Sequence, residues 1–173
     1  VLIKSQDYEK IWQNFSRENF ESLIGHARLV TNGSMSYHVN NQPVNKNGVI
    51  LVHNGIVVND QDLWSQFPDL NREAEVDTEI IAALIKKFID QTNSLALALQ
   101  KTFSLIKGAC SLAGLINDQN EVFLATNNGS LYYLSNTANN FFIFASEKHI
   151  LEKISQHWHF KRQFSAQKIY QLP

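Results

Sequence analysis

Residues 51–59 read LVHNGIVVN and place an Asn-Gly pair between two apolar runs. Asn-Gly between apolar runs is the strongest short-range signal for a tight β-hairpin, because both residues tolerate positive φ angles. The continuous apolar run before the pair predicts a buried strand over residues 49–53, with residues 56–58 returning beside it. The pair also suits chemistry, since the Asn54 amide and the Gly55 N–H can both donate to a developing oxyanion. Taken alone, the pair is better explained by the turn, and the rest of the chain has to decide between the two interpretations.

Two helices are predicted after this stretch. Asp77 is a good N-cap for a helix over residues 78–90, whose apolar positions follow the helical period. A second helix over residues 94–106 repeats the pattern, and Gly108 stops it. The remaining chain shows short strands joined by Asn-rich turns, at residues 111–116, 121–126, 130–134 and 141–145. This order of elements predicts an α+β layered fold with antiparallel sheets rather than parallel βαβ units.

The composition is that of a globular domain. The 173 residues, 44% of them hydrophobic and 18% charged, suffice for one domain with a sizeable core. A net charge of -1 without a long basic run makes nucleic acid and anionic membranes unexpected partners. No apolar run reaches the roughly eighteen residues that a membrane span requires. The single cysteine, Cys110, excludes an internal disulfide and a cysteine-rich zinc site. We expect a cytoplasmic protein without a metal or cofactor.

Polar residues of the first half gather where predicted elements begin or end. Taken alone, Arg28 is explained by a surface ion pair and Asp77 by helix capping. Taken together, they suit a free amino acid: a guanidinium can bind an α-carboxylate through two parallel hydrogen bonds, and a carboxylate can hold an α-ammonium group. The Asn54 amide and the Gly55 N–H add the donors that a tetrahedral oxyanion requires.

The motifs GHARLVTNG, NNQPV, LVHNGIVVN and VDTEIIAALI stand in the order and at about the spacing of class II glutamine amidotransferase domains, which this chain resembles. The similarity continues, more weakly, through KGACSLAGLI, FLATNNGSLYYL and FFIFASEKHIL. These domains are the N-terminal-nucleophile glutaminase modules of sugar-phosphate aminotransferases, phosphoribosylamine synthases and asparagine synthetases. The resemblance implies a four-layer αββα sandwich of antiparallel sheets and a single domain over residues 1–173.

The resemblance also implies a glutamine site. Arg28 would bind the glutamine carboxylate and Asp77 its amino group, while Thr31 would line the pocket. Asn54 and Gly55 would form the oxyanion hole. The domain would supply ammonia to a partner synthase domain or subunit, and a homo-oligomer is left open.

The catalytic nucleophile of the family is absent from this sequence. In the family it is a cysteine at the mature N-terminus, whereas this chain begins at Val1, whose side chain has no nucleophilic atom. Cys110 is expected to be a buried packing residue. We therefore expect the chain to be incomplete at its N-terminus and part of a longer polypeptide, or, less favoured, a degenerate domain. We also expect that the 173-residue chain alone does not hydrolyse glutamine.

Several alternatives remain open. Leu29 and Asn32 depart from the aminotransferases, residues 41–44 favour an asparagine-synthetase-type domain, and residues 53–57 favour the aminotransferases again. A non-catalytic glutamine-sensing or scaffold domain of the same fold is a further interpretation, as is a hydrolase of a different amide with an N-terminal nucleophile. His149, His157 and His159 are close in sequence, but a metal site is disfavoured, because a strand would direct His157 and His159 to one face with no carboxylate beside them.

Overall fold

The computed structural model describes residues 22–27, 37–117, 121–135, 142–156 and 170–171. The helices in these parts are η1 (a 3₁₀ turn, His38–Asn40), α2 (Asp60–Gln66), α3 (Asp77–Thr92), α4 (Leu95–Leu105) and α5 (Lys148–Gln156). The strands are β1 (Val44–Lys46), β2 (Val49–Val57), β3 (Gly108–Ile116), β4 (Glu121–Thr126), β5 (Tyr132–Ser135), β6 (Phe142–Ala145) and β7 (Tyr170–Gln171). Among the described helices, none combines the length and the apolar character needed to span a bilayer.

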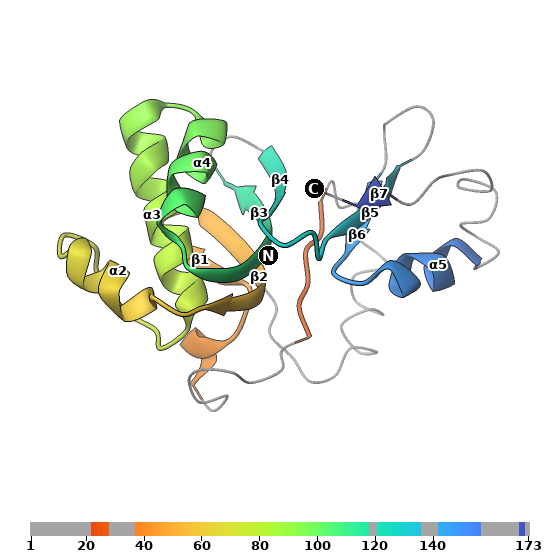
Figure 1. The fold of residues 1–173 in the computed structure, drawn as a ribbon, viewed down its shortest axis with the longest axis horizontal. Helices are drawn as coiled ribbons and strands as arrows, with labels where there is room; N and C mark the ends of the chain where they lie inside the picture. Colours follow the sequence, from red (N-terminus) through yellow and green to blue (C-terminus); the bar gives the residue numbers. More distant parts are fainter. Residues whose placement is uncertain (1–21, 28–36, 118–120, 136–141, 157–169, 172–173) are drawn as a thin grey trace.

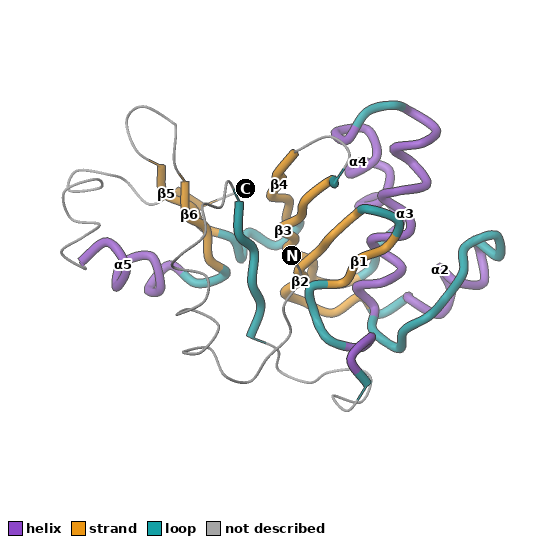
Figure 2. Tube along the Cα trace, turned by 180° about the vertical axis from the view of Figure 1, so that it is seen from behind, coloured by secondary structure: helices purple, strands orange, loops and turns teal. Residues whose placement is uncertain are grey.

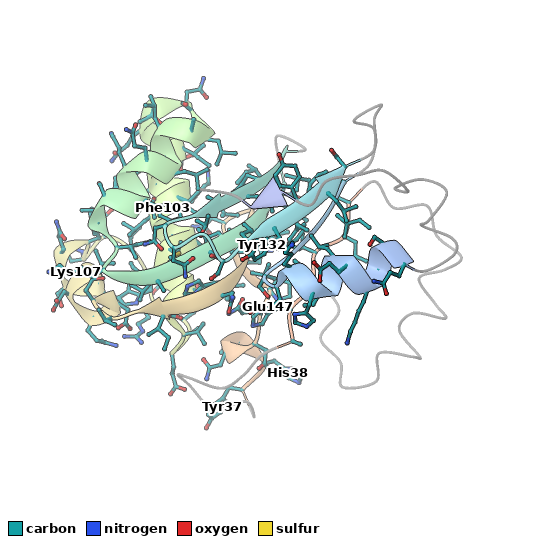
Figure 3. All side chains as sticks on the ribbon, turned by 45° about the vertical axis from the view of Figure 1, so that its right-hand side comes forward. Tyr37, His38, Phe103, Lys107, Tyr132 and Glu147 are labelled. Atoms are coloured by element: carbon teal, nitrogen blue, oxygen red, sulfur yellow. The ribbon has the colours of Figure 1, made fainter. Side chains whose placement is uncertain are left out.

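The strands form two antiparallel sheets, one in the order β1-β2-β3-β4 and one in the order β6-β5-β7. Helix α3 packs on β1 and β2, α4 packs against α3, and α5 packs on β5 and β6. Figure 1 shows the α3–α4 pair, the larger sheet, the smaller sheet and α5 following one another across the molecule. In Figure 3, Phe103 and Lys107 mark the α4 side, and Tyr132 and Glu147 mark the smaller sheet and α5. The predicted α+β fold with antiparallel sheets is confirmed.

The main core lies between the larger sheet and α3. This helix is buried over most of its circumference, because the sheet covers one side and α4 another. Each fully buried aliphatic side chain contributes about 1.5–3 kcal/mol through removal from water. The side chains that are completely buried here include Leu51, Ile80, Ile81, Leu84, Ile85 and Leu112. The burial holds α3 against β1 and β2 (Figure 2), and Asp77 at the start of the helix contacts Val57, the last residue of β2.

The prediction of a turn at Asn54-Gly55 is wrong. Strand β2 is unbroken through this pair and follows β3 residue by residue, from Val49 opposite Ile116 to Val57 opposite Gly108. Gly55 has φ of +142°, and a Cβ atom there would lie 2.0 Å from the carbonyl oxygen of Ala109. The glycine is therefore required by the close approach of β3 and not by a change of chain direction.

A different Asn-Gly pair forms the hairpin. Asn47 and Gly48 connect β1 to β2 with φ angles of 51° and 85°, and Lys46 pairs with Val49 across them. Positive φ at both central residues is the requirement of the two-residue hairpin turn that Asn-Gly favours. An Asn-Gly pair therefore does form a hairpin turn in this chain, but it is the pair seven positions earlier.

Candidate active site

Asp77 joins the start of α3 to the edge of β2. It is the first residue of the helix, one position earlier than predicted, and only 5% of its surface is exposed. Its Oδ2 accepts a hydrogen bond of 2.8 Å from the N–H of Val57, and its Oδ1 lies 3.6 Å from Nδ1 of His53. The Asp77 carboxylate therefore binds the neighbouring strand. The residue before it, Val76, forms no side-chain cap bond.

The environment of Asp77 favours the ionised carboxylate. Burial alone would raise its pKa, but the His53 imidazole and the N–H groups of Val57 and Thr78 hold that pKa below its ordinary value. The positive end of the α3 dipole acts in the same direction. A negative charge therefore stands at this end of the helix, next to the edge of β2.

Gln42 holds the backbone of His53 on the same edge. Its Oε1 accepts the His53 N–H, and its Nε2 donates to the His53 carbonyl over 3.1 Å and to Oγ1 of Thr78 over 3.2 Å. In the sequence analysis, Gln42 is only a member of the NNQPV motif. The available signal was the register of a β1–β2 hairpin, which sets residue 42 opposite residue 53.

The N–H of Gly55 is directed to this edge between two anchored positions. Because β2 pairs with β3 without a break, every second backbone N–H of β2 points to the same side of the strand. His53 and Val57, on either side of Gly55, have their N–H groups bound by Gln42 and Asp77. Gly55 is half-buried. The Gly55 donor thus lies two residues along the strand from the N–H that the Asp77 carboxylate binds, in a part of the strand that is fixed on both sides.

The side chain of Asn54 lies on the other face of the sheet. It is exposed, whereas His53 is buried against α3 with 3% exposure, and consecutive side chains of a strand alternate in direction. Asn54 pairs with Ser111 of β3, whose hydroxyl is 2.7 Å from that of Thr126. The structure thus brings together Asp77, His53 and the Gly55 backbone, and directs the Asn54 amide to the opposite face.

The other predicted residues are placed as follows. Arg28 and Thr31 lie outside the described residues. Cys110 is completely buried opposite Gly55 in β3, which confirms it as a packing residue. Burial, assisted by the negative charge of Asp77, raises the pKa of its thiol to about 12. Such a thiol holds almost no thiolate at neutral pH and is a poor nucleophile.

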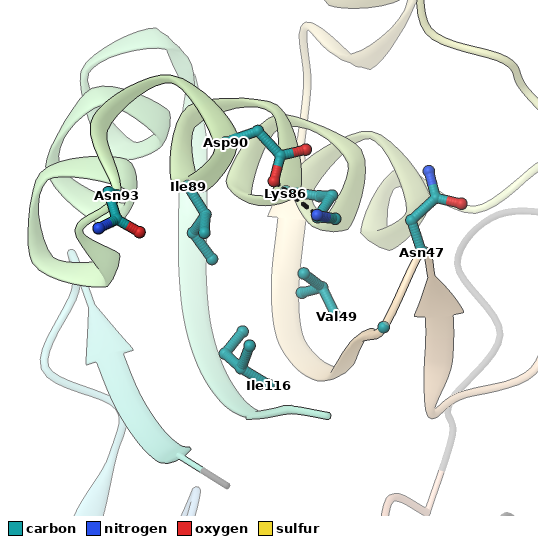
Figure 4. A pocket seen from close by; sticks show the side chains of 8 residues that line it. Asn47, Val49, Lys86, Ile89, Asp90, Asn93 and Ile116 are labelled. Atoms are coloured by element: carbon teal, nitrogen blue, oxygen red, sulfur yellow. Dashed lines mark hydrogen bonds and ion pairs between the residues drawn. The ribbon is translucent and has the colours of Figure 1, made fainter. Parts of the chain in front are cut away.

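No metal site or second ligand site is evident in the described parts of the chain. There, no three His, Cys, Asp or Glu side chains are grouped to bind a metal ion, and His157 and His159 lie outside these parts. A shallow hollow occurs at the opposite end of β2, near the β1–β2 turn (Figure 4). Its charged residues, Lys86 and Asp90, are already paired with each other. We assign no ligand to it.

One family model and several curated proteins match this chain in sequence. A family model described as "Glutamine amidotransferase domain" matches residues 26–153. The glutamine–fructose-6-phosphate aminotransferase (isomerizing) of Bacillus subtilis is 32% identical over 113 residues, which cover 62% of this chain and 18% of the relative. The corresponding enzyme of Xanthomonas campestris is 35% identical over 108 residues, covering 61% and 18%. The chain therefore spans less than a fifth of the length of these relatives.

Two solved structures are also similar to this chain. The glutamine phosphoribosylpyrophosphate amidotransferase of B. subtilis, in complex with ADP and GMP, aligns with a TM-score of 0.57 and 26% identity over 73% of this chain and 28% of that one. A structure described as the allosteric regulatory enzyme of purine biosynthesis aligns with a TM-score of 0.52 and 26% identity, over 67% and 26%.

Proposed function

Because the chain belongs to the glutamine amidotransferase domain family, we propose that it binds L-glutamine as the glutaminase domain of a glutamine-dependent amidotransferase. The family match confirms the resemblance predicted from the sequence. In this proposal the domain serves a synthase domain or subunit that accepts ammonia. The curated relatives favour an aminotransferase of the sugar-phosphate type over an asparagine-synthetase type. We also propose that residues 1–173 act as one domain, in the cytoplasm.

The proposed site follows the edge of β2. Asp77 would bind the α-ammonium group of glutamine, Arg28 its α-carboxylate, and Thr31 would line the pocket. Gly55 would donate its N–H at the edge to the oxyanion that forms when the side-chain amide is attacked, and Asn54 would donate its amide from the exposed face of β2, onto which the glutamine side chain would extend. One observation carries the proposal: the ionised carboxylate of Asp77 is bound to the strand two residues beyond the Gly55 N–H.

The arrangement supports stabilisation of an oxyanion because the donor is held in place before any substrate arrives. Donors that need no reorganisation during reaction stabilise developing charge most effectively. The nucleophile is a separate matter. Cys110, the one cysteine of the sequence, is buried, and its thiol has a pKa of about 12. We therefore propose that the 173-residue chain binds glutamine without hydrolysing it.

Calorimetric titration of the chain with L-glutamine tests the proposal. Arg28→Ala should weaken binding roughly ten- to a hundred-fold, because losing a charge-assisted hydrogen bond costs about 1.5–3 kcal/mol. Arg72→Ala is the matched control, since Arg72 is exposed and contacts Gln61 and the carbonyl of Ala74. A glutamine analogue without the α-amino group should bind as weakly to the wild-type chain as it does to Asp77→Asn. Absence of glutamine binding, or equal binding by both arginine variants, would refute the proposal.

A second candidate is a non-catalytic glutamine sensor of the same fold, favoured by the burial of Cys110, the one cysteine of the sequence. Both candidates predict glutamine binding, but they differ in a full-length protein. A glutaminase domain releases ammonia and glutamate there, whereas a sensor binds glutamine without consuming it. Measuring glutamate formation by the full-length protein separates the two.

A further inference from the structure

The pairing of β1 with β2 ends just before the proposed site. Val44 is opposite Leu51, so a continuation of the register would set residue 42 opposite His53. Strand β1 begins only at Val44, and Pro43 has no N–H to offer. The backbone N–H and C=O of His53 are directed to this edge, where a buried peptide group without a partner would cost about 1–3 kcal/mol.

The side chain of Gln42 takes the place of the missing strand. A glutamine amide carries the same donor and acceptor as a peptide group. Its oxygen accepts the His53 N–H and its nitrogen donates to the His53 carbonyl, as a neighbouring backbone would. These two contacts also fix the orientation of the amide, because reversing it would bring donor against donor and acceptor against acceptor.

The second N–H of the same amide reaches the start of α3. It donates to Oγ1 of Thr78, the residue after Asp77, and this hydroxyl lies 3.4 Å from Nδ1 of His53. Thr78 is completely buried. A single side-chain amide therefore connects the strand that carries Gly55 to the helix that carries Asp77.

We propose that Gln42 is a positioning residue that sets the Gly55 N–H relative to the Asp77 carboxylate. Gly55 has the conformational freedom of a glycine, and its φ of +142° lies where other residues are rare. Gln42 fixes the strand two residues before it and Asp77 fixes the strand two residues after it. The consequence for glutamine rests on the proposed function, whereas the consequence for the strand does not.

The experiment uses the whole 173-residue chain and three variants. Gln42→Met keeps the length of the side chain and removes its donors and acceptor. Gln42→Glu keeps an oxygen for the His53 N–H and lacks the two donors. Gln100→Met is the matched control, because Gln100 is exposed on α4. Amide hydrogen exchange and chemical shifts are measured by NMR, and glutamine affinity by calorimetry, both far below the unfolding temperature.

In Gln42→Met the His53 amide should exchange about tenfold faster, the loss expected for one hydrogen bond, and the Gly55 amide resonance should shift. Glutamine affinity should fall about tenfold for the same reason. Gln42→Glu should restore protection of the His53 amide but not the affinity, which also decides the matter if Gln42→Met does not fold. Gln100→Met should change neither.

Two results would overturn the proposal. One is a His53 amide that exchanges equally in Gln42→Met and Gln100→Met. The other is faster exchange with unchanged glutamine affinity, which would make Gln42 a purely structural residue. If the wild-type chain binds no glutamine, the proposed function fails instead, and the exchange and shifts of His53 and Gly55 still decide whether Gln42 sets this edge.

Discussion

Replacing Lys46 with methionine removes the cation from a buried ion pair that joins β1 to α3. Nζ of Lys46 lies 2.8 Å from Oε1 of Glu79 and 3.2 Å from Oε1 of Glu73. The Lys46 and Glu79 side chains are 7% and 2% exposed. Glu79 also accepts the backbone N–H groups of Glu73 and Ala74. The variant therefore leaves a buried carboxylate with its backbone donors but without its counter-ion.

The expected cost follows from these contacts. Breaking one side of a buried pair typically costs about 3–5 kcal/mol, and because Glu79 retains its N–H donors we expect Lys46→Met to cost about 3 kcal/mol. Glu79→Gln should cost a similar amount, because it weakens the acceptor for Lys46 and for the Ala74 N–H. The double variant should cost clearly less than the sum, with a coupling energy of about 1.5–3 kcal/mol.

Urea unfolding of the four proteins at pH 7 gives the coupling energy. The matched control is the exposed pair Lys148 and Glu152, with side chains 58% and 46% exposed, whose coupling should be about 0.3–0.5 kcal/mol. Burial lowers the pKa of Lys46, but the neighbouring carboxylates of Glu79 and Glu73 raise it by more, so the pKa lies above its ordinary value. The coupling should therefore persist below about pH 10.4, the unfolded-state pKa, and be lost only as the pH rises through the folded-state pKa. A buried coupling no larger than that of the exposed pair would refute the reasoning.

Three further predictions concern the site. Gly55→Ala should cost about 3 kcal/mol or more, because the new Cβ would meet a backbone oxygen at an unfavourable φ. Gly114→Ala should cost about 1–3 kcal/mol, because the nearest atoms to its Cβ belong to two side chains. Urea unfolding compares the two variants, and equal costs would contradict the argument. Asp77 has a lowered pKa, so its contribution to stability is present above about pH 3.9, the unfolded value, and is lost as the pH falls through the folded pKa. The stability of Asp77→Asn should consequently depend less on pH between 5 and 2, and an unchanged pH dependence would count against this. Cys110 should react with a thiol-specific disulfide reagent only after unfolding; fast reaction of the native chain would show that the thiol is accessible.

The helices were predictable because their signal is local. The 3.6-residue period predicted residues 78–90 and 94–106, and the structure has α3 over Asp77–Thr92 and α4 over Leu95–Leu105. The position of the hairpin was not predictable in this way. Asn47-Gly48 and Asn54-Gly55 present the same local chemistry, and only pairing with β3 across the sheet makes the second pair part of a strand.

The site was predictable where its residues carry a local signal and was missed where they meet only through strand pairing. Asp77 was identified from its place at a helix start and from the family motif, and the structure sets it beside the Gly55 edge. Gln42 was missed because its partner, His53, is eleven residues away and becomes its neighbour only through the β1–β2 register. The direction of the Asn54 side chain likewise follows from a continuous β2, which the turn prediction had excluded.

The most direct test of the glutamine site is a crystal structure of this chain with L-glutamine bound. The account predicts the α-ammonium nitrogen within about 3.2 Å of a carboxylate oxygen of Asp77, and the side-chain amide oxygen within about 3.1 Å of the Gly55 nitrogen. Glutamine bound elsewhere, for instance in the hollow near the β1–β2 turn, with Asp77 contacting only Val57 and His53, would contradict it.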